Sequence, residues 1–260
     1  MNNERFLFTG TGGSMGVPVI GCHCPVCTSP VKENKRLRSA GFLYVQDKVI
    51  AIDAGPDFRT QCLRYGIEDI DGIFVTHTHA DHINGLDDVR IFHFRKKAPI
   101  PLMLSEVSTE DIEARFHYFF PPFKGDMSQS KKIDLQIVDK DFGDVEFLGI
   151  PFKVVTYYQA GMKITGFRYK SFAYITDIQT YSDEIYEHLQ GLDTLVLSAL
   201  RWTPSLVHFT IDDALTFIDK VKPKKALLTH IAHDLEHHDT LERLPDHVRV
   251  AYDGLEVPID

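Results

Sequence analysis

Long apolar runs are missing from this sequence, and their absence limits where the protein can work. No stretch approaches the roughly 18–20 apolar residues that a membrane-spanning helix needs. The N-terminus, MNNERFLFTG, has no basic segment followed by a long apolar one, so it does not resemble a secretion signal. We therefore expect a cytoplasmic protein that does not associate with membranes.

Positive charge is also scarce. Lys and Arg total 28 against 37 Asp and Glu, which gives a formal net charge of −9. Proteins that bind long nucleic acids usually present a basic face, so we expect no nucleic-acid partner, transfer RNA included. A small phosphate-containing substrate is still compatible with this balance. With 43% hydrophobic and 25% charged residues, the composition is that of a globular chain.

Cysteine is rare, yet three of the four cysteines lie close together. Cys22, Cys24 and Cys27 follow a C-x-C-x-x-C pattern, and Cys62 is isolated. In a compartment where thiols stay reduced, three thiols at this spacing are better metal ligands than a disulfide framework. Free thiols are the alternative. Cys62 lies in a predicted helix, where we expect an inert core residue.

Short runs rich in β-branched and aromatic residues recur along the chain, and each predicts a strand. In order, the predicted strands are Arg5–Thr9, Phe42–Gln46, Val49–Asp53, Gly72–Thr76, Ile100–Leu104, Ile133–Val138, Val145–Phe147, Phe152–Thr156, Ile164–Tyr169, Phe172–Thr176, Thr194–Ser198 and Lys225–Thr229. Helical periodicity follows Ser108 and Thr210, each with an aspartate three residues on, as at a capped helix start. Weaker helical patterns cover Asp57–Tyr65 and Tyr181–Leu189.

The order of these elements predicts the fold class. Strands alternate with helices but also follow one another directly, in one chain without repeats or a composition-biased linker. Such an order favours a layered α/β architecture with mixed rather than purely parallel sheets. We expect one domain over residues 1–260, carrying the cysteine-rich loop at about residues 20–30.

The segment 75-VTHTHADHING-85 gathers three histidines and an aspartate within six residues. His77 and His79 follow an apolar strand and point the same way if the chain stays extended. Asp81 and His82 come next, at the turn into a helix that Asn84–Asp88 would begin. These groups suit zinc, manganese or iron, and without a metal they would repel one another or lack partners. A solvated loop that is merely rich in histidine is the alternative.

Similar residues stand at the ends of other predicted strands. Asp53 ends one strand, Asp177 and His230 follow two others, and His233 lies three residues beyond His230. Ligands at the ends of several strands can form one site at one sheet edge, which is a common place for active sites in α/β proteins. We therefore expect these side chains to join the histidine segment.

These motifs resemble those of a known superfamily. The segment 77-HTHADH-82 matches the H-x-H-x-D-H motif of the metallo-β-lactamase-fold hydrolases, and its other motifs correspond to 52-IDAG-55, 176-TDI-178 and 229-THIAH-233. The opening 9-TGTGGSMGVPVIGCHCPVC-27 resembles the phosphoribosyl cyclic phosphodiesterases of phosphonate breakdown. To a lesser degree it resembles a pyrroloquinoline quinone biosynthesis protein of the same superfamily.

The resemblance implies an α/β fold, an αβ/βα four-layer sandwich with two mixed β-sheets, and two divalent metals (Zn, Mn or Fe) in its cleft. Asp53 would orient a ligand imidazole. The resemblance implies that the first metal is bound by His77 and His79, the second by Asp81, His82 and His230, and that Asp177 binds both. It also implies a separate structural zinc bound by Cys22, Cys24, Cys27 and His233. The last set would form a closed tetrahedral site.

The chain departs from the superfamily pattern at one position. Members usually supply a third histidine to the first metal, but 155-VTYYQAGMKITGF-167 contains no histidine, and Gln159 falls nearest the expected place. An amide oxygen is a poorer zinc ligand than an imidazole. We therefore predict unequal occupancy, with the first metal bound weakly, replaced by manganese or iron, or lost.

The resemblance also suggests catalytic residues. Two metals roughly 3.5–4 Å apart can lower the pKa of a bound water to about 7 and clamp a phosphate in line. His208, in 207-VHFTIDDA-214, matches the histidine that the cyclic phosphodiesterases place in the active site. We assign His208 to leaving-group protonation or phosphate contact, and count Asp81 with it as a catalytic candidate. A surface histidine near a helix cap is the alternative for His208.

Other conspicuous residues have weaker interpretations. Arg168 could reach a substrate phosphate or form a structural ion pair. The segment 10-GTGGSMG-16 follows a strand, but Pro18 and the cysteines come next, so tight turns explain its glycines better than a dinucleotide loop. Histidines expected at the surface or the edge of the core are His93, His117, His188 and His247, while His237 and His238 receive no role.

Taken together, these patterns predict a metal-dependent hydrolase. We expect a phosphodiesterase that uses a metal-bound hydroxide on a small phosphate ester, with cyclic esters among the candidates. A thioesterase or lactonase on the same scaffold is one alternative. A non-catalytic protein of cofactor biosynthesis is another, because the missing histidine weakens the first metal position. A homodimer is expected only because homodimers are common.

Overall fold

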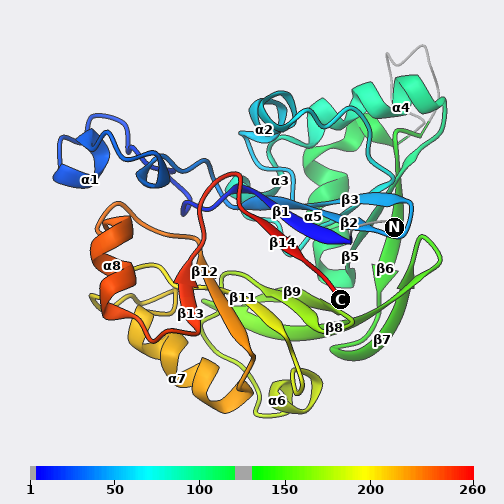
Figure 1. The fold of residues 1–260 in the computed structure, drawn as a ribbon. Helices are drawn as coiled ribbons and strands as arrows, with labels where there is room; N and C mark the ends of the chain where they lie inside the picture. The colour runs from blue at the N-terminus through cyan, green and yellow to red at the C-terminus, as the bar shows by residue number, and fades with distance from the viewer. Residues whose placement is uncertain (1–3, 121–130) are drawn as a thin grey trace.

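The computed structural model describes residues 4–120 and 131–260 and is built around two seven-stranded sheets (Figure 1). The first sheet has the order β14-β1-β2-β3-β4-β5-β6 and the second the order β13-β12-β11-β10-β9-β8-β7. The first contains β1 (Arg5–Gly10), β2 (Ala40–Val45), β3 (Lys48–Ile52), β4 (Gly72–Phe74), β5 (Ile100–Ser105), β6 (Ile133–Val138) and β14 (Glu256–Pro258). The second contains β7 (Phe142–Phe147), β8 (Ile150–Gln159), β9 (Met162–Tyr169), β10 (Phe172–Ile175), β11 (Thr194–Ser198), β12 (Lys225–Thr229) and β13 (Val248–Val250).

Both sheets are mixed, in the same way. In the first, β14, β1, β2 and β3 pair antiparallel, while β3, β4, β5 and β6 pair parallel. In the second, β7 to β10 pair antiparallel and β10 to β13 pair parallel. The predicted fold class, a four-layer α/β sandwich with two mixed sheets, is therefore confirmed.

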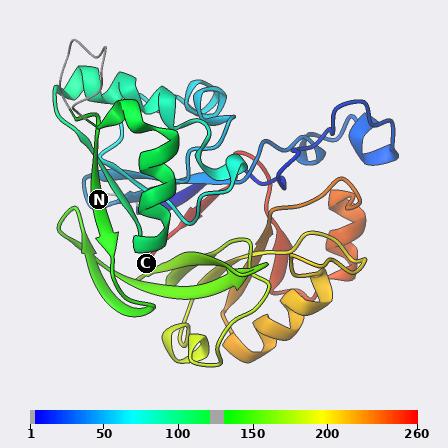
Figure 2. The ribbon, with the colours of Figure 1, turned by 180° about the vertical axis from the view of Figure 1, so that it is seen from behind.

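Helices cover the outer face of each sheet (Figures 1 and 2). Over the first sheet lie α2 (Phe58–Tyr65), α3 (Ala80–Ile83), α4 (Arg90–Lys96) and α5 (Glu106–Arg115), and over the second lie α6 (Ile185–His188), α7 (Ile211–Val221) and α8 (His237–Arg243). The short helix α1 (Pro25–Thr28) projects from the sandwich near α8. In the described part of the chain, no helix has the length and apolar character needed to cross a membrane.

The apolar core has three layers, one between the sheets and one under each helical layer. Between the sheets, the ring centroids of Phe74 and Phe167 are 5.1 Å apart, and those of Phe6 and Tyr174 are 5.4 Å apart. Burial of one such aromatic side chain stabilises the folded state by about 1.5–3 kcal/mol. This packing holds the two sheets together and fixes the edge at which the candidate ligands lie.

Most predicted elements are present, with a few corrections. The helix after Thr210 is confirmed: the Thr210 side chain accepts the Asp213 N–H, and the Asp213 carboxylate accepts the Thr210 N–H. The helix placed after Ser108 in fact begins at Glu106, because β5 runs directly into it and Ser105 occupies the cap position. The strands β13 and β14 were not predicted. The helix expected from Tyr181 is shorter, and α3 begins at Ala80 rather than at Asn84.

Candidate metal centre and cleft

The candidate cleft ligands lie at the ends of strands from both sheets. Those of the first sheet follow β4, since His77 and His79 come after its end, and Asp81 and His82 lie in the turn of α3 that follows. In the second sheet Gln159 ends β8, Asp177 follows β10 and His230 follows β12. The two sheets thus bring these residues to one edge of the sandwich, as the sequence pattern predicted.

Three of the predicted site residues have a left-handed backbone. The φ angles of Asp53, Asp177 and His230 are 62°, 58° and 59°. Each residue lies just past the end of a strand, where the chain turns sharply. Residues other than glycine seldom adopt this conformation, which costs on the order of 1–3 kcal/mol and often marks functional sites. The strain is maintained by the packed strands on either side.

One cluster of four side chains has the spacing of a metal site. His82 Nε2 lies 3.5 Å from Asp81 Oδ2 and 3.3 Å from Asp177 Oδ2. His230 Nε2 lies 3.6 Å from the same Asp81 oxygen and 3.2 Å from Asp177 Oδ1. Four ligands about 2.1 Å from a tetrahedral zinc are about 3.4 Å apart. The residues implied for the second metal therefore fit a cation at their centre.

The hydrogen bonds of this cluster leave ligand atoms without partners. His82 Nδ1 donates to Asp53 Oδ2 at 2.7 Å, so Nε2 carries a lone pair that faces two carboxylates. His82 Nε2 and His230 Nε2 are buried and have no hydrogen-bond partner among the described residues. A buried lone pair beside carboxylate oxygens is unfavourable unless a cation lies between them. The residues present thus suit a metal ion.

The charges of the cluster support the same conclusion. Burial alone would lower the pKa of His82, but the carboxylates of Asp177 and Asp53 raise it well above its usual value. Burial alone would raise the pKa of Asp177, but the imidazoles of His230 and His82 hold it well below its usual range. The carboxylates around His82 thus favour a positive charge at this place, and a metal cation bound to Nε2 would supply it.

The carboxylate of Asp53 orients a second imidazole through a threonine. The Thr76 hydroxyl donates to Asp53 Oδ2 at 2.9 Å and lies 3.0 Å from His77 Nδ1. Because that hydroxyl has given its proton to Asp53, it accepts from His77 Nδ1–H, which leaves His77 Nε2 as the free ligand atom. Asp53 therefore fixes His82 directly and His77 indirectly. Thr76 was missed in the sequence, although it directly precedes the H-x-H motif.

The residues implied for the first metal fit less well. His77 Nε2 and His79 Nδ1 are 2.9 Å apart, but His79 joins no group of three ligand atoms, whereas His77 groups with His82 and Asp177. Gln159 lies where the resemblance placed it, with its Nε2 3.3 Å from Asp177 Oδ1. Its Oε1 is buried without a hydrogen-bond partner among the described residues. Only an amide stands where a third imidazole is usual.

His208 lies in the cleft rather than on the open surface. Its Nδ1 is 3.4 Å from Asp177 Oδ1, its ring centroid is 4.8 Å from that of His230, and its side chain is 10% exposed. Burial and the nearby His230 lower its pKa to about 4. The Gln159 amide nitrogen is 2.9 Å from Nδ1 and 3.0 Å from Nε2 of this ring. It is therefore almost equally distant from the two ring nitrogens and is not directed at one of them.

The three thiols of the cysteine-rich loop gather around His233. The Sγ atoms of Cys22, Cys24 and Cys27 lie 3.3, 3.5 and 3.5 Å from His233 Nδ1. Zinc bonds of about 2.3 Å to sulfur and 2.0–2.1 Å to nitrogen give a sulfur–nitrogen separation of about 3.5 Å in a tetrahedron. The N–H of Cys27 lowers the pKa of Cys24 to about 6, while burial and the neighbouring thiols raise that of Cys27 to about 11. The set fits the predicted zinc.

Arg168 and the glycine segment have structural roles. Arg168 donates to the carbonyl oxygens of Lys170, His188 and Gln190. Among the described residues it forms no ion pair, and it does not line the cleft. Both interpretations offered for it were therefore wrong. In the glycine segment, a Cβ atom on Gly10 would clash with the backbone carbonyl of Arg38, so glycine is needed there for the close approach of two chain segments.

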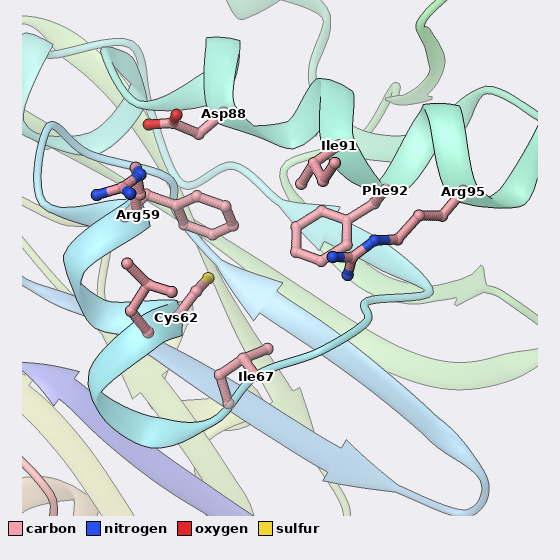
Figure 3. A pocket seen from close by; sticks show the side chains of 9 residues that line it. Arg59, Cys62, Ile67, Asp88, Ile91, Phe92 and Arg95 are labelled. Carbon is pink, nitrogen blue, oxygen red and sulfur yellow. The ribbon is translucent and has the colours of Figure 1, made fainter.

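Cys62 lies far from the cleft, beside a small hollow between α2 and α4 (Figure 3). This hollow has a volume of about 240 Å³ and is lined by apolar side chains such as Phe58, Ile67 and Phe92, with Arg59 at its margin. Cys62 is half-buried rather than fully buried. Burial raises the pKa of its thiol to about 12, which disfavours the reactive thiolate form. Cys62 packs against the core but is not part of the fully buried core that was predicted.

With the fold and the cleft described, the chain can be placed among known proteins. A family model described as the beta-lactamase superfamily domain matches residues 48–231. The chain belongs to this superfamily, that of the metallo-β-lactamase-fold hydrolases. It is close to the PhnP family: it is 38% identical to a crystallised diphosphatase of that family, covering 99% of this chain and 97% of the other with a TM-score of 0.91.

Two further relatives extend the comparison. The Zn²⁺-bound PqqB of Methylobacterium extorquens has a TM-score of 0.76 over 98% of this chain and all of the other, but at 15% identity it shares only the fold. An octanoyltransferase of Porphyromonas gingivalis is 33% identical over 98% of this chain. The chain spans about half of that relative, 52% of its length.

Proposed function

We propose that this protein is a metal-dependent phosphodiesterase acting on a small phosphate ester. The observation that carries the proposal is the cluster of unpartnered imidazole nitrogens and carboxylate oxygens at tetrahedral spacing. The likeness to a diphosphatase of the PhnP family supports chemistry at phosphorus rather than at carbon. The acidic net charge favours a small substrate over a nucleic acid.

The residues of the cleft divide between holding metal and handling the ester. Asp81, His82, His230 and Asp177 would hold one divalent metal, and His77, His79 and Asp177 a second, with Gln159 beside it. When bound, such metals polarise a phosphoryl oxygen and activate water for attack. Asp53 and Thr76 hold the ligand imidazoles in one tautomer, so that their free nitrogens face the cleft.

His208 is the candidate proton donor to the leaving alkoxide. Its imidazole lies beside Asp177 at the rim of the cleft, where a leaving oxygen would emerge. The lowered pKa of His208 applies to the cleft when no substrate is bound. A bound anionic phosphate would raise that pKa, because a nearby negative charge favours the imidazolium. The histidine can then give up its proton as the ester bond breaks.

A thioester or ester hydrolase is the second candidate. The relative named an octanoyltransferase supports it, because almost the whole of this chain matches about half of that protein. The same cleft could polarise an acyl carbonyl instead of a phosphoryl group. However, the name belongs to a protein about twice as long as the matched region, and its transferase chemistry can lie in the other half.

A substrate panel separates the two candidates. The purified protein, with added manganese or zinc, would be assayed with bis(p-nitrophenyl) phosphate, an octanoyl thioester and a lactone. We expect turnover of the phosphodiester that exceeds the other two by at least tenfold. Thioester turnover without phosphodiester turnover would establish the second candidate, and no turnover of any of the three would contradict both.

The same assay tests His208. Replacing it with alanine should lower the rate on the phosphodiester by about 100-fold or more, within the range that general acid catalysis contributes. His247→Ala is the matched control, because His247 is exposed and lies just before β13, outside the cleft. Equal rates for His208→Ala and the unaltered protein would remove His208 from the mechanism.

A further inference from the structure

A second cavity adjoins the metal cleft. The cleft has a volume of about 430 Å³ and is lined by residues that include His79, Asp81 and Asp177. The second cavity has a volume of about 490 Å³. Ser14, Val207 and His208 line both, so the cavities adjoin at these residues. A substrate bound at the metals could thus extend past His208 into the second cavity, which we call the side cavity.

The side cavity is largely apolar. Its apolar lining residues are Met15, Val19, Leu200, Leu206, Val207 and Ile231. Two of them are unusually exposed for large apolar side chains, Leu206 at 90% and Met15 at 67%. Exposed apolar side chains gathered beside a catalytic cleft are typical of a surface that contacts a ligand.

The side cavity offers few unengaged polar groups. Its cation, Arg201, has Nη1 4.0 Å from the carboxylate of Asp234, and its Nη2 donates to the Pro204 carbonyl at 3.3 Å. The Nε of Arg201 is buried and has no hydrogen-bond partner among the described residues, so one donor is left free. His233, which also lines the cavity, faces the three thiols. A second phosphate or a sugar would need several free hydrogen-bonding or cationic groups here. An apolar group needs none, and therefore fits this lining better.

Hydrogen bonds hold the walls of the side cavity in place. The Gln179 side chain donates to the Leu206 carbonyl and accepts the Ala160 N–H at 2.8 Å, which ties two loops together. Ser205 Oγ accepts the N–H groups of Val207 and His208 at 3.3 and 3.2 Å. The backbone of the Leu206 loop is thus held by one hydrogen bond to Gln179 and by two within the loop, so its apolar side chains are presented before a ligand arrives.

We propose that the substrate is a phosphate ester whose leaving alcohol is apolar, with the phosphate in the metal cleft and the alkyl or aryl group in the side cavity. His208 lies at the junction of the two, where it meets the leaving oxygen. This assignment rests on the proposed function, because it places a phosphate at the metals. In this assignment, Met15, Leu206 and Val207 contact the apolar group and thereby select the substrate.

Binding of alkylphosphonates tests the assignment without requiring turnover. The manganese-loaded protein would be titrated with methyl-, butyl- and octylphosphonate in a calorimeter, below the concentration at which the octyl compound forms micelles. We expect octylphosphonate to bind at least about tenfold more tightly than methylphosphonate, as for methylenes added within an apolar pocket. Less than a threefold difference would overturn the proposal.

Variants locate the preference in the side cavity. The double substitution Leu206→Ser with Met15→Ser should reduce the octyl-over-methyl ratio to about threefold or less, while Leu206→Phe should keep it. Leu63→Ser is the matched control, since Leu63 is 67% exposed and lines the hollow between α2 and α4 (Figure 3). An unchanged ratio in the double variant would overturn the assignment.

Two further outcomes are informative. Octyltrimethylammonium binding as tightly as octylphosphonate would show detergent-like adsorption and overturn the proposal. A dimer in solution that dissociates in the double variant, with no chain-length preference, would assign the side cavity to a second copy and also overturn it. Because binding is measured directly, failure of the phosphodiesterase assay alone leaves the result of this titration readable.

Discussion

The imidazoles and carboxylates of the cleft lie at the ends of strands from both sheets, whereas the three thiols lie on the short segment that leads into α1, with Cys24 at the N-cap of that helix and Cys27 within it. Four of the cleft ligands, His77, His82, Asp177 and His230, are buried. Asp53 and Thr76 fix the ring orientation of His82 and His77. Around the thiols, the buried apolar residues are Val17, Val26 and Cys27. One site is thus organised by the surrounding fold, and the other has little besides its ligands to organise it.

This difference teaches how each site should respond to the loss of its ion. The strands around the cleft are held by apolar packing on both faces, so the ligands keep their places when no cation is bound. In the cysteine-rich loop, the ion itself supplies much of the stabilisation, as in small zinc-binding modules. We therefore expect removal of the cleft ions to abolish catalysis without disturbing the fold around them. Removal of the thiol-bound ion should instead disorder the cysteine-rich loop.

Substitution of Asp177 should break the cleft and spare the loop. Asp177→Asn keeps the size and tolerates the left-handed backbone, but removes the charge that His82 and His230 face. We expect the cleft ions to be lost on dialysis and phosphodiester turnover to fall by at least about 100-fold, the upper range for loss of a ligand's partner. Elemental analysis should still find the thiol-bound zinc. Retention of all cleft ions would contradict the assignment.

Substitution of Cys24 should do the reverse. In Cys24→Ser the hydroxyl can still cap α1, where the sulfur now accepts the Cys27 N–H at 3.4 Å, so only the thiolate is lost. One zinc per chain should disappear, and the melting temperature should fall by at least about 2–4 °C, the shift for each kcal/mol in a chain of this size. Turnover should fall by less than tenfold. An unchanged zinc content would refute the tetrahedral site.

Substitution of Gln159 should separate the two metal positions of the cleft, and we expect its effect to be the smallest of the three. Gln159→His supplies the imidazole that the superfamily usually places here, and should strengthen the first metal position by about tenfold or more, raising cleft content towards two ions per chain. Gln159→Ala, which supplies no ligand atom, is the control. Two tightly held cleft ions in the unaltered protein would show that the amide is sufficient and the prediction of unequal occupancy wrong.

The sequence predicted the sheets better than their edges. Runs such as Ile133–Val138 and Thr194–Ser198 match their strands to the residue, because β-branched and apolar side chains mark them clearly. The strands β13 and β14 are three residues each, too short to show an alternating pattern. The start of α5 was misplaced because Ser108 and Asp111 imitate a capping box three residues inside the helix.

For the site, the sequence predicted which residues meet but not how they are held. His77, His82, Asp177 and His230 come together as their positions after strands suggested. The left-handed turns, the bridge through Thr76 and the contact of Gln159 with His208 depend on packing between segments far apart in the chain. Arg168 was misjudged for the same reason, since its partners are backbone carbonyls that no side-chain pattern reveals.

The left-handed backbones of Asp53, Asp177 and His230 tie the geometry of the cleft to the integrity of the sandwich. All three residues are buried next to packed strands, so their turns can relax only when those strands move. Loss of catalysis on warming should therefore coincide with the melting of the sheets rather than precede it.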